Sequence, residues 1–213
     1  FEAMSPDVHM RSKVLRQSQR DIMGPAPELL ALHYKISRWE TFRNEALHLA
    51  GTSARDTREQ LIAMLAPLED LLDAFEYYII SLFAHTLNLA RCGHQSVVVC
   101  LVKIMERENQ EDERTAAIRF AKHAKIDGAA RFHGIATYGH SIKLYWHKFQ
   151  DTLRVSALQR LLKAWTSLRE PSPAELYSQI DWLYDELDQA RAWLVPLFPS
   201  TCNVFKMYVQ AHH

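Results

Sequence analysis

The sequence predicts an all-α protein. Apolar residues recur at steps of three and four along most of its 213 residues, the period of an amphipathic helix packed on a neighbour. Only six glycines and eight prolines interrupt the chain, and runs alternating β-branched with polar residues do not occur. The one β-like segment, residues 97–100, lies inside a helical pattern. The pattern favours about seven or eight helices, some of them long.

Composition excludes several classes of function. Lysine plus arginine equals aspartate plus glutamate at 25 each, so no net charge draws in nucleic acid or acidic lipid. No apolar run reaches the roughly 20 residues needed to cross a bilayer. Cys92, Cys100 and Cys202 lack metal-ligand spacing, and their odd number favours reduced thiols in the cytosol. We therefore expect a cytoplasmic protein with no transmembrane segment and no nucleic-acid partner.

The first helix is expected at residues 5–22. Ser5 before Pro6 is typical of a helix start, because the hydroxyl accepts a free backbone N–H and proline fits the first helical position. The segment is basic and has few apolar anchors, so we interpret its cations as a solvated face, with an anionic contact as the alternative. Alone it has little to bury and needs a partner or upstream chain. The cations are Arg11, Lys13, Arg16 and Arg20, and the anchors are Met10, Val14 and Ile22.

Residues 24–27 break the chain, and a second helix follows over residues 28–49. Gly51 is a natural residue to end it, because glycine adopts the left-handed conformation at low cost. A polar link then runs over residues 52–57. The apolar stripe of this helix consists of Leu29, Leu32, Ile36, Trp39, Phe42 or Arg43, Ala46 and Leu49.

The next stripe keeps strict steps of four and three and ends near Arg91, before Gly93. Pro67 falls inside it, and we predict a break at Ala66 with Pro67 restarting the helix, a kink being the alternative. Acidic residues just after Pro67 would suit the positive end of a new helix dipole. The stripe consists of Leu61, Leu65, Leu68, Leu72, Phe75, Ile79 and Leu82.

A further helix begins at Gln95 or Ser96, with Val98, Val102 and Met105 facing inward. Residues 106–114 are highly charged and indicate an exposed helical extension or a loop. The helical pattern resumes at residue 115, and we predict a continuous helix to Gln150 despite two glycines. Its later stripe consists of Ile135, Tyr138, Ile142, Tyr145 and Phe149.

Residues 153–168 continue in helical period, and Ser172-Pro173 with Glu175 starts a long amphipathic helix. Pro196 and Pro199 end it, and a last helix starts near Thr201, within which the sequence stops, as expected of a fragment. The inner stripe of the long helix is Leu176, Ile180, Leu183, Leu187, Ala190 and Leu194. Its polar face is Gln179, Asp185, Glu186, Asp188 and Gln189, and the last helix presents Val204, Phe205, Tyr208 and Val209.

Two clusters suggest chemistry, and neither supports it well. His133, His140 and His147 are seven residues apart, about 10.5 Å per step on a helix, too far to share one metal ion. Glu69, Asp70 and Asp73 resemble the Mg²⁺–diphosphate motif of isoprenoid synthases, but no second metal motif accompanies them. The sequence therefore assigns no catalytic, cofactor-binding or metal-binding residue.

Three stretches, in order, match motifs of one known family. Residues 24–33 are GPAPELLALH, similar to an opening GPEPELLKLH. Residues 97–108, VVVCLVKIMERE, resemble an apolar helix that runs into an I-x-E-x-E charge cluster. Residues 194–199, LVPLFP, with VFK at 204–206, Tyr208 and QAH at 210–212, look like MVPLMP…IFKTY…YHQ. Together the three stretches resemble the exocyst complex component 3 family, and the first resembles its fungal members in particular.

The resemblance implies a non-catalytic subunit of the exocyst, which tethers secretory vesicles to the plasma membrane before SNARE-mediated fusion. It implies an elongated stack of antiparallel helical bundles, with other exocyst subunits and SNARE proteins or their regulators as partners. Residues 1–23 would be the end of a coiled-coil arm, and residues 24–213 a helical bundle domain. The alternatives are another helical interaction module, of tethering-complex or GTPase-effector type, and a Mg²⁺-dependent isoprenoid enzyme.

Overall fold

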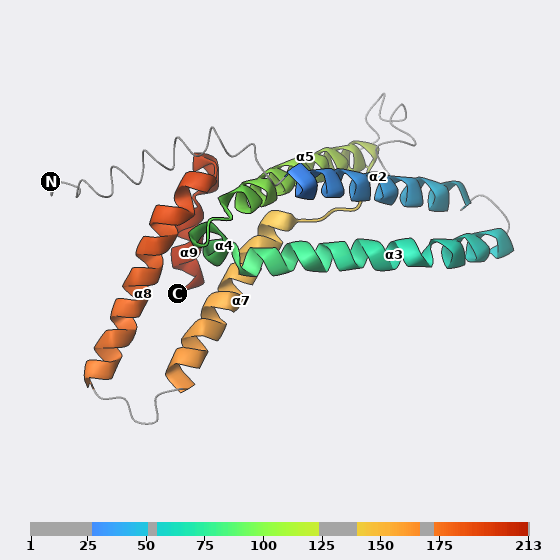
Figure 1. The fold of residues 1–213 in the computed structure, drawn as a ribbon. Coiled ribbons are helices and arrows are strands. Elements are labelled where there is room, and N and C mark those ends of the chain that lie inside the picture. The colour runs from blue at the N-terminus through green and yellow to red at the C-terminus, as the bar shows by residue number, and fades with distance from the viewer. Residues whose placement is uncertain (1–26, 51–54, 124–139, 167–172, 213) are drawn as a thin grey trace. The chain divides into compact units, whose positions relative to one another are not determined.

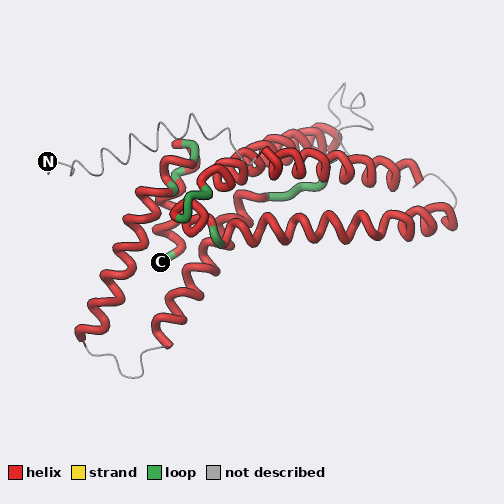
Figure 2. Tube along the Cα trace, in the orientation of Figure 1, coloured by secondary structure: helices red, strands yellow, loops and turns green. Residues whose placement is uncertain are grey.

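The structure, a computed structural model, describes residues 27–50, 55–123, 140–166 and 173–212. These residues form α-helices and short 3-10 helices, with no strand among them (Figures 1 and 2). The prediction of an all-α fold is therefore confirmed. The α-helices are α2 (Pro27–Ala50), α3 (Arg55–Ala84), α4 (Thr86–Arg91), α5 (Gln95–His123), α7 (Tyr145–Thr166), α8 (Pro173–Trp193) and α9 (Val204–Ala211), and the 3-10 helices are η2 (Val195–Leu197) and η3 (Ser200–Cys202).

The described residues belong to two compact units. The described part of unit 1 lies in Pro27, Leu82–Val102 and Lys148–His213, and that of unit 2 lies in Glu28–Ser81 and Lys103–His147. Helices α3, α5 and α7 each contribute residues to both, and α2 belongs to unit 2 except for Pro27. The expected helix at residues 5–22 and the arm boundary at residue 23 lie outside the described residues.

The core of unit 1 is built around Phe149, which has no solvent exposure. Its ring meets Phe83 edge-on with 5.4 Å between centroids, and stacks on Phe198 at 5.5 Å. Aromatic pairs in these geometries stabilise a core beyond the area that they bury. Helix α8 packs against α4, η2 and α9, and Ala190 and Leu194 of its predicted stripe are buried.

The rest of the α8 prediction is mixed. Leu183 and Leu187 are half-buried, and the side chains of Leu176 and Ile180 lie outside the described residues. Asp185 and Asp188 are exposed as predicted, whereas Glu186 is buried and the prediction for it is wrong. It is buried because it has basic and hydroxyl partners within unit 1, which periodicity alone does not reveal.

The helix predicted to reach Arg91 divides at His85 into α3 and α4. Its end at Gly93 is confirmed. Gly93 has φ +88°, the left-handed region that glycine adopts without strain. The next N–H, of His94, donates to the carbonyl of Leu89 at 2.9 Å, as in a Schellman motif.

Pro67 does not break its helix. Helix α3 runs without interruption from Arg55 to Ala84, with Pro67 inside it. The predicted break is therefore wrong, and no new helix start is present for the neighbouring carboxylates to stabilise. Buried side chains on the core face, Leu72, Phe75 and Ile79, hold the following turns in place despite the hydrogen bond that proline cannot donate.

Helix α2 of unit 2 faces the core with a different side than predicted. Ile36 is buried, but the neighbouring buried positions are His33 and Glu40. The predicted apolar stripe lies mostly in solvent, because polar partners on α5 and on residues 140–144 take the inner face. The large exposed side chains are Leu32, Trp39, Phe42 and Leu49.

Two further expectations for unit 2 need correction. The charged stretch at 106–114 is helical, as one of the two alternatives predicted, but Glu108 and Asp112 are buried on α5 rather than exposed. Residues 140–144 are not helical, so no continuous helix reaches Gln150, and α7 starts only at Tyr145. Of the predicted stripe, Tyr145 and Phe149 are buried and Ile142 is exposed, while Ile135 and Tyr138 lie outside the described residues.

The last helix is confirmed, with a start slightly later than predicted. Asn203 adopts φ +42°, and its side-chain oxygen accepts a hydrogen bond from the N–H of Lys206 at 3.3 Å. Asparagine tolerates this left-handed conformation better than most residues and is a favoured helix cap. Val204 and Tyr208 are buried, while Phe205 and Val209 are half-buried.

Candidate functional site: a buried polar cluster and a polar pocket

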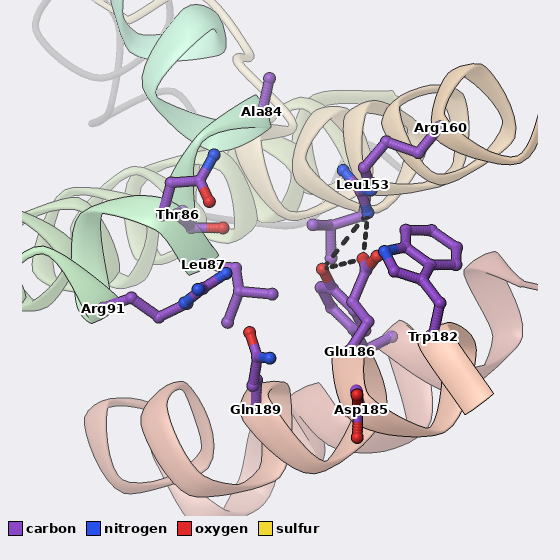
Figure 3. A pocket seen from close by; sticks show the side chains of 12 residues that line it. Ala84, Thr86, Leu87, Arg91, Leu153, Arg160, Trp182, Asp185, Glu186 and Gln189 are labelled. Atoms are coloured by element: carbon purple, nitrogen blue, oxygen red, sulfur yellow. Dashed lines mark hydrogen bonds and ion pairs between the residues drawn. The ribbon is translucent and has the colours of Figure 1, made fainter. Parts of the chain in front are cut away.

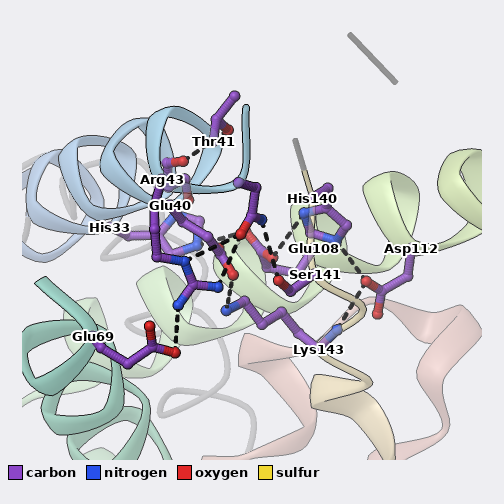
Figure 4. Close-up of polar contacts among 12 residues, drawn as sticks. His33, Glu40, Thr41, Arg43, Glu69, Glu108, Asp112, His140, Ser141 and Lys143 are labelled. Atoms are coloured by element: carbon purple, nitrogen blue, oxygen red, sulfur yellow. Dashed lines mark hydrogen bonds and ion pairs between the residues drawn. The ribbon is translucent and has the colours of Figure 1, made fainter. Parts of the chain in front are cut away.

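A cluster of ion pairs occupies the interior of unit 2 (Figure 4). His33 Nε2 on α2 lies 2.8 Å from Glu108 Oε1 on α5, and both side chains are 4% exposed. On the segment before α7, Lys143 Nζ reaches Glu40 Oε1 at 2.7 Å. Such pairs, taken out of water, contribute little net stability when intact but are costly to break singly. The cluster therefore specifies how α2, α5 and residues 140–144 fit together.

Asp112 contacts three groups on residues 140–144. One carboxylate oxygen lies 2.7 Å from His140 Nε2 and accepts the backbone N–H of Lys143 at 3.0 Å. The other oxygen accepts the N–H of Leu144 at 2.8 Å. Leu144 has φ +53°, which is strained for a residue with a Cβ. Asp112 thus holds the chain in the turn that leads into α7.

Tyr145 follows that turn and is buried. Burial first, and then the carboxylates of Glu76, Glu108, Glu40 and Asp112, raise the pKa of its phenol well above the usual range. The hydroxyl therefore keeps its proton at physiological pH. The residues of this cluster connect α2, α5 and the turn before α7 within unit 2.

Unit 1 contains a polar pocket of about 240 Å³ between α4, α7, α8 and α9 (Figure 3). Arg160, Trp182, Glu186 and Tyr208 are among its lining residues, and Arg91 lines it from α4. The lining thus combines both charge signs with aromatic surface. Among the described residues that line it there is no cysteine, histidine or serine.

Glu186 organises one wall of this pocket. Its Oε1 accepts hydrogen bonds from Arg160 at 2.6 Å and from the Tyr208 hydroxyl at 2.8 Å, with His212 Nε2 at 3.6 Å. Burial alone would raise the pKa of Glu186, but its contacts with His212, Tyr208 and Arg160 outweigh burial and hold that pKa below its ordinary value. Burial and the Glu186 charge raise the pKa of Tyr208. Glu186, Tyr208 and Arg160, which we call the Glu186 triad, therefore contain a charged carboxylate and a protonated phenol at neutral pH.

The suspected metal-binding carboxylates do not form a site. Glu69 on α3 pairs with Arg43 on α2 at 2.7 Å, while Asp70 and Asp73 are exposed. Within the described residues, no group of three or more His, Cys, Asp or Glu side chains is arranged to hold a metal ion.

The three histidines spaced by seven share no helical face. His140 lies in the non-helical segment and contacts Asp112, His147 is exposed on α7, and His133 lies outside the described residues. No helix in the described part of the chain combines the length and apolar character needed to span a membrane.

Comparison with known proteins decides the family. A model of the family described as exocyst complex component Sec6 matches residues 65–213, well over half of the chain. The chain belongs to the Sec6 family. The resemblance of its motifs to an exocyst subunit is thereby confirmed, and two of the three motif stretches lie inside the matched residues.

Two curated yeast proteins are similar to this Sec6-family chain. Exocyst complex component sec6 of Schizosaccharomyces pombe is 27% identical over 188 residues, which cover 87% of this chain and 25% of that protein. Exocyst complex component SEC6 of Saccharomyces cerevisiae is 25% identical over 222 residues, covering 88% of this chain and 28% of that protein. The chain thus spans about a quarter of the length of these relatives. No solved structure matches it significantly.

Proposed function

We propose that this chain is part of a non-catalytic exocyst subunit that tethers secretory vesicles to the plasma membrane before SNARE-mediated fusion. The family match over residues 65–213 is the observation that supports this function. Exocyst complex component 3, which the sequence motifs resemble, and Sec6, which the family model describes, would then be the same kind of subunit, here of fungal type. Residues 1–23 would end a coiled-coil arm, and residues 24–213 would belong to an elongated stack of helical bundles.

The geometry is consistent with a role in binding rather than catalysis. The titratable groups buried in both units are engaged with one another, as in the Glu186 triad and the Asp112 contacts. The partners we propose are the other exocyst subunits, together with SNARE proteins and their regulators. The subunit would be cytoplasmic, peripheral at sites of polarised secretion, and without a nucleic-acid partner.

The test is affinity purification of the full-length subunit, tagged in its own cells, with mass spectrometry of the bound proteins. We expect the other exocyst subunits in near-stoichiometric amounts, and fluorescence of the tagged protein at sites of polarised growth. Purification without any exocyst subunit, under conditions that retain a known member of the complex, would reject the proposal.

A further inference from the structure

An unusual surface of unit 2 is the outer side of α2. Residues Leu32, Lys35, Trp39, Phe42, Ala46 and Leu49 follow one another at steps of three and four, the spacing of the a and d positions of a coiled coil. We call this set the α2 seam. It extends for about 25 Å along the helix.

The α2 seam is apolar apart from Lys35, and most of it lies in solvent. Trp39 and Phe42 are each 54% exposed and Leu49 is 70% exposed, and the two aromatic rings meet edge-on at 6.1 Å. The exposed apolar area is on the order of 400 Å², comparable to the largest apolar patch of a typical monomer, which is often functional. The inner side of the same helix carries His33 and Glu40. The most apolar face of α2 is thus the one that unit 2 leaves exposed.

Cations flank the α2 seam. The guanidinium carbons of Arg38 and Arg107 lie 5.9 and 5.2 Å from the centre of the Tyr34 ring. Tyr34 thus makes a cation–π contact with each of the two arginines. Lys35 lies in the seam itself and is exposed. None of these three cations has a carboxylate partner among the described residues. Gathered cations of this kind attract an anionic partner.

A pocket of about 420 Å³ opens next to the α2 seam. Phe42 belongs to both, and the pocket is also lined by Arg38 and Arg107. Glu45, Glu108, Glu111 and His140 also line it, so the lining combines acidic and basic side chains. A helix lying along the seam has room there to insert one side chain, the usual arrangement of a helix in a groove.

We propose that the α2 seam binds an amphipathic helix of another exocyst subunit, one whose apolar stripe is flanked by Asp and Glu. The apolar stripes pack together, and the acidic flank meets Lys35, Arg38 and Arg107. A second copy of this chain would bring the same cations to the interface, and residues 5–22 carry four Lys and Arg against two Asp, so like charges disfavour both. That the helix comes from another exocyst subunit rests on the proposed function, whereas its acidic, amphipathic character is inferred from the α2 seam.

The first test measures affinity of the full-length subunit for each other exocyst subunit, expressed singly. The double variant Trp39→Ser/Phe42→Ser should weaken binding to one of them at least tenfold, because exposed aromatic side chains dominate helix interfaces. Arg38→Glu should weaken the same binding several-fold and more at low than at high salt. The matched controls are Phe120→Ser and Arg119→Glu, exposed residues on α5 outside the seam, which should leave it unchanged.

The second test places a photo-cross-linking amino acid at Phe42 in the assembled complex. We expect cross-links to an acidic amphipathic helix of another subunit. Cross-links within the same polypeptide, or to a second copy of it, would overturn the inference. So would the absence of any cross-link when position 42 is accessible to water. In all these outcomes the subunit still co-purifies with the exocyst, whereas failure of the proposed function would abolish co-purification of the unaltered protein.

Discussion

The hydroxyl of Tyr208 donates a hydrogen bond of 2.8 Å to the carboxylate of Glu186, and Arg160 donates to the same oxygen. Glu186 lies on α8, Tyr208 on α9 and Arg160 on α7, so one buried oxygen joins three helices of unit 1. The contacts favour the ionised carboxylate, which is why the pKa of Glu186 is lowered despite burial. Unit 1 should therefore be sensitive to acid at this residue.

The first prediction concerns pH. A carboxylate whose pKa is lowered by folding adds stability that is complete above its unfolded value, here 4.5, and that is lost as pH falls through the folded pKa. Glu186→Gln should cost about 1–3 kcal/mol at neutral pH and flatten the loss of stability below pH 4.5. Denaturant unfolding from pH 7 to pH 3 measures both. Asp188→Asn, an exposed neighbour, is the control. An unchanged acid slope in Glu186→Gln would contradict this account.

The second prediction concerns the aromatic core of unit 1. Phe149→Ala should lower the free energy of unfolding by about 3–5 kcal/mol, because the cavity lies between Phe83 and Phe198 and closes only partly. Phe120→Ala, the same change at a 70% exposed site, should cost less than about 0.5 kcal/mol. Chemical denaturation of both variants provides the comparison. Equal costs at the two sites would show that Phe149 is not a core residue.

The third prediction concerns the turn before α7. Asp112→Ala removes the carboxylate that accepts hydrogen bonds from the backbone N–H groups of Lys143 and Leu144. A cost of about 1–3 kcal/mol is expected. Hydrogen exchange should accelerate at these two amides more than at the amides of α9. Exchange unchanged at Lys143 and Leu144 would mean that Asp112 does not hold the turn.

The fourth prediction concerns Pro67. Since α3 continues through it, Pro67→Ala should restore a helical hydrogen bond and raise the free energy of unfolding, by about 1–3 kcal/mol. Were a helix to start at this proline, alanine would be neutral or destabilising there. Thermal and denaturant unfolding of the variant distinguish the two cases.

Periodicity and punctuation were enough to predict the fold class and most helix boundaries. The end at Gly93, the start at Gln95 and the buried Ala190 and Leu194 all follow from local signals. Pro67 misled because an internal proline costs about 3 kcal/mol, which the packing of Leu72, Phe75 and Ile79 in the following turns can offset. A prediction from the residues next to Pro67 does not take this tertiary packing into account.

The polar interior of unit 2 was not predicted. Glu108 and Asp112, spaced by four on α5, point the same way, but equal spacing is common on solvated faces. Their partners His33 and His140 lie 75 and 28 positions away in the sequence, and only the fold brings them close. The local signal of this polar inner face is the spacing of His33, Ile36 and Glu40 by three and four along one helix.

The ion pairs of unit 2 also fix the axial alignment of α2 against α5. His33 meets Glu108 at a single height along the two helices. If α2 moved along α5 by one turn, about 5.4 Å, His33 and Glu108 would both lose their partner. Leucines at the same positions would still pack against other apolar side chains. These specific polar contacts therefore keep α2 from sliding along α5. Apolar substitutions of the polar residues inside unit 2 should leave it stable but allow the two helices to slide past one another.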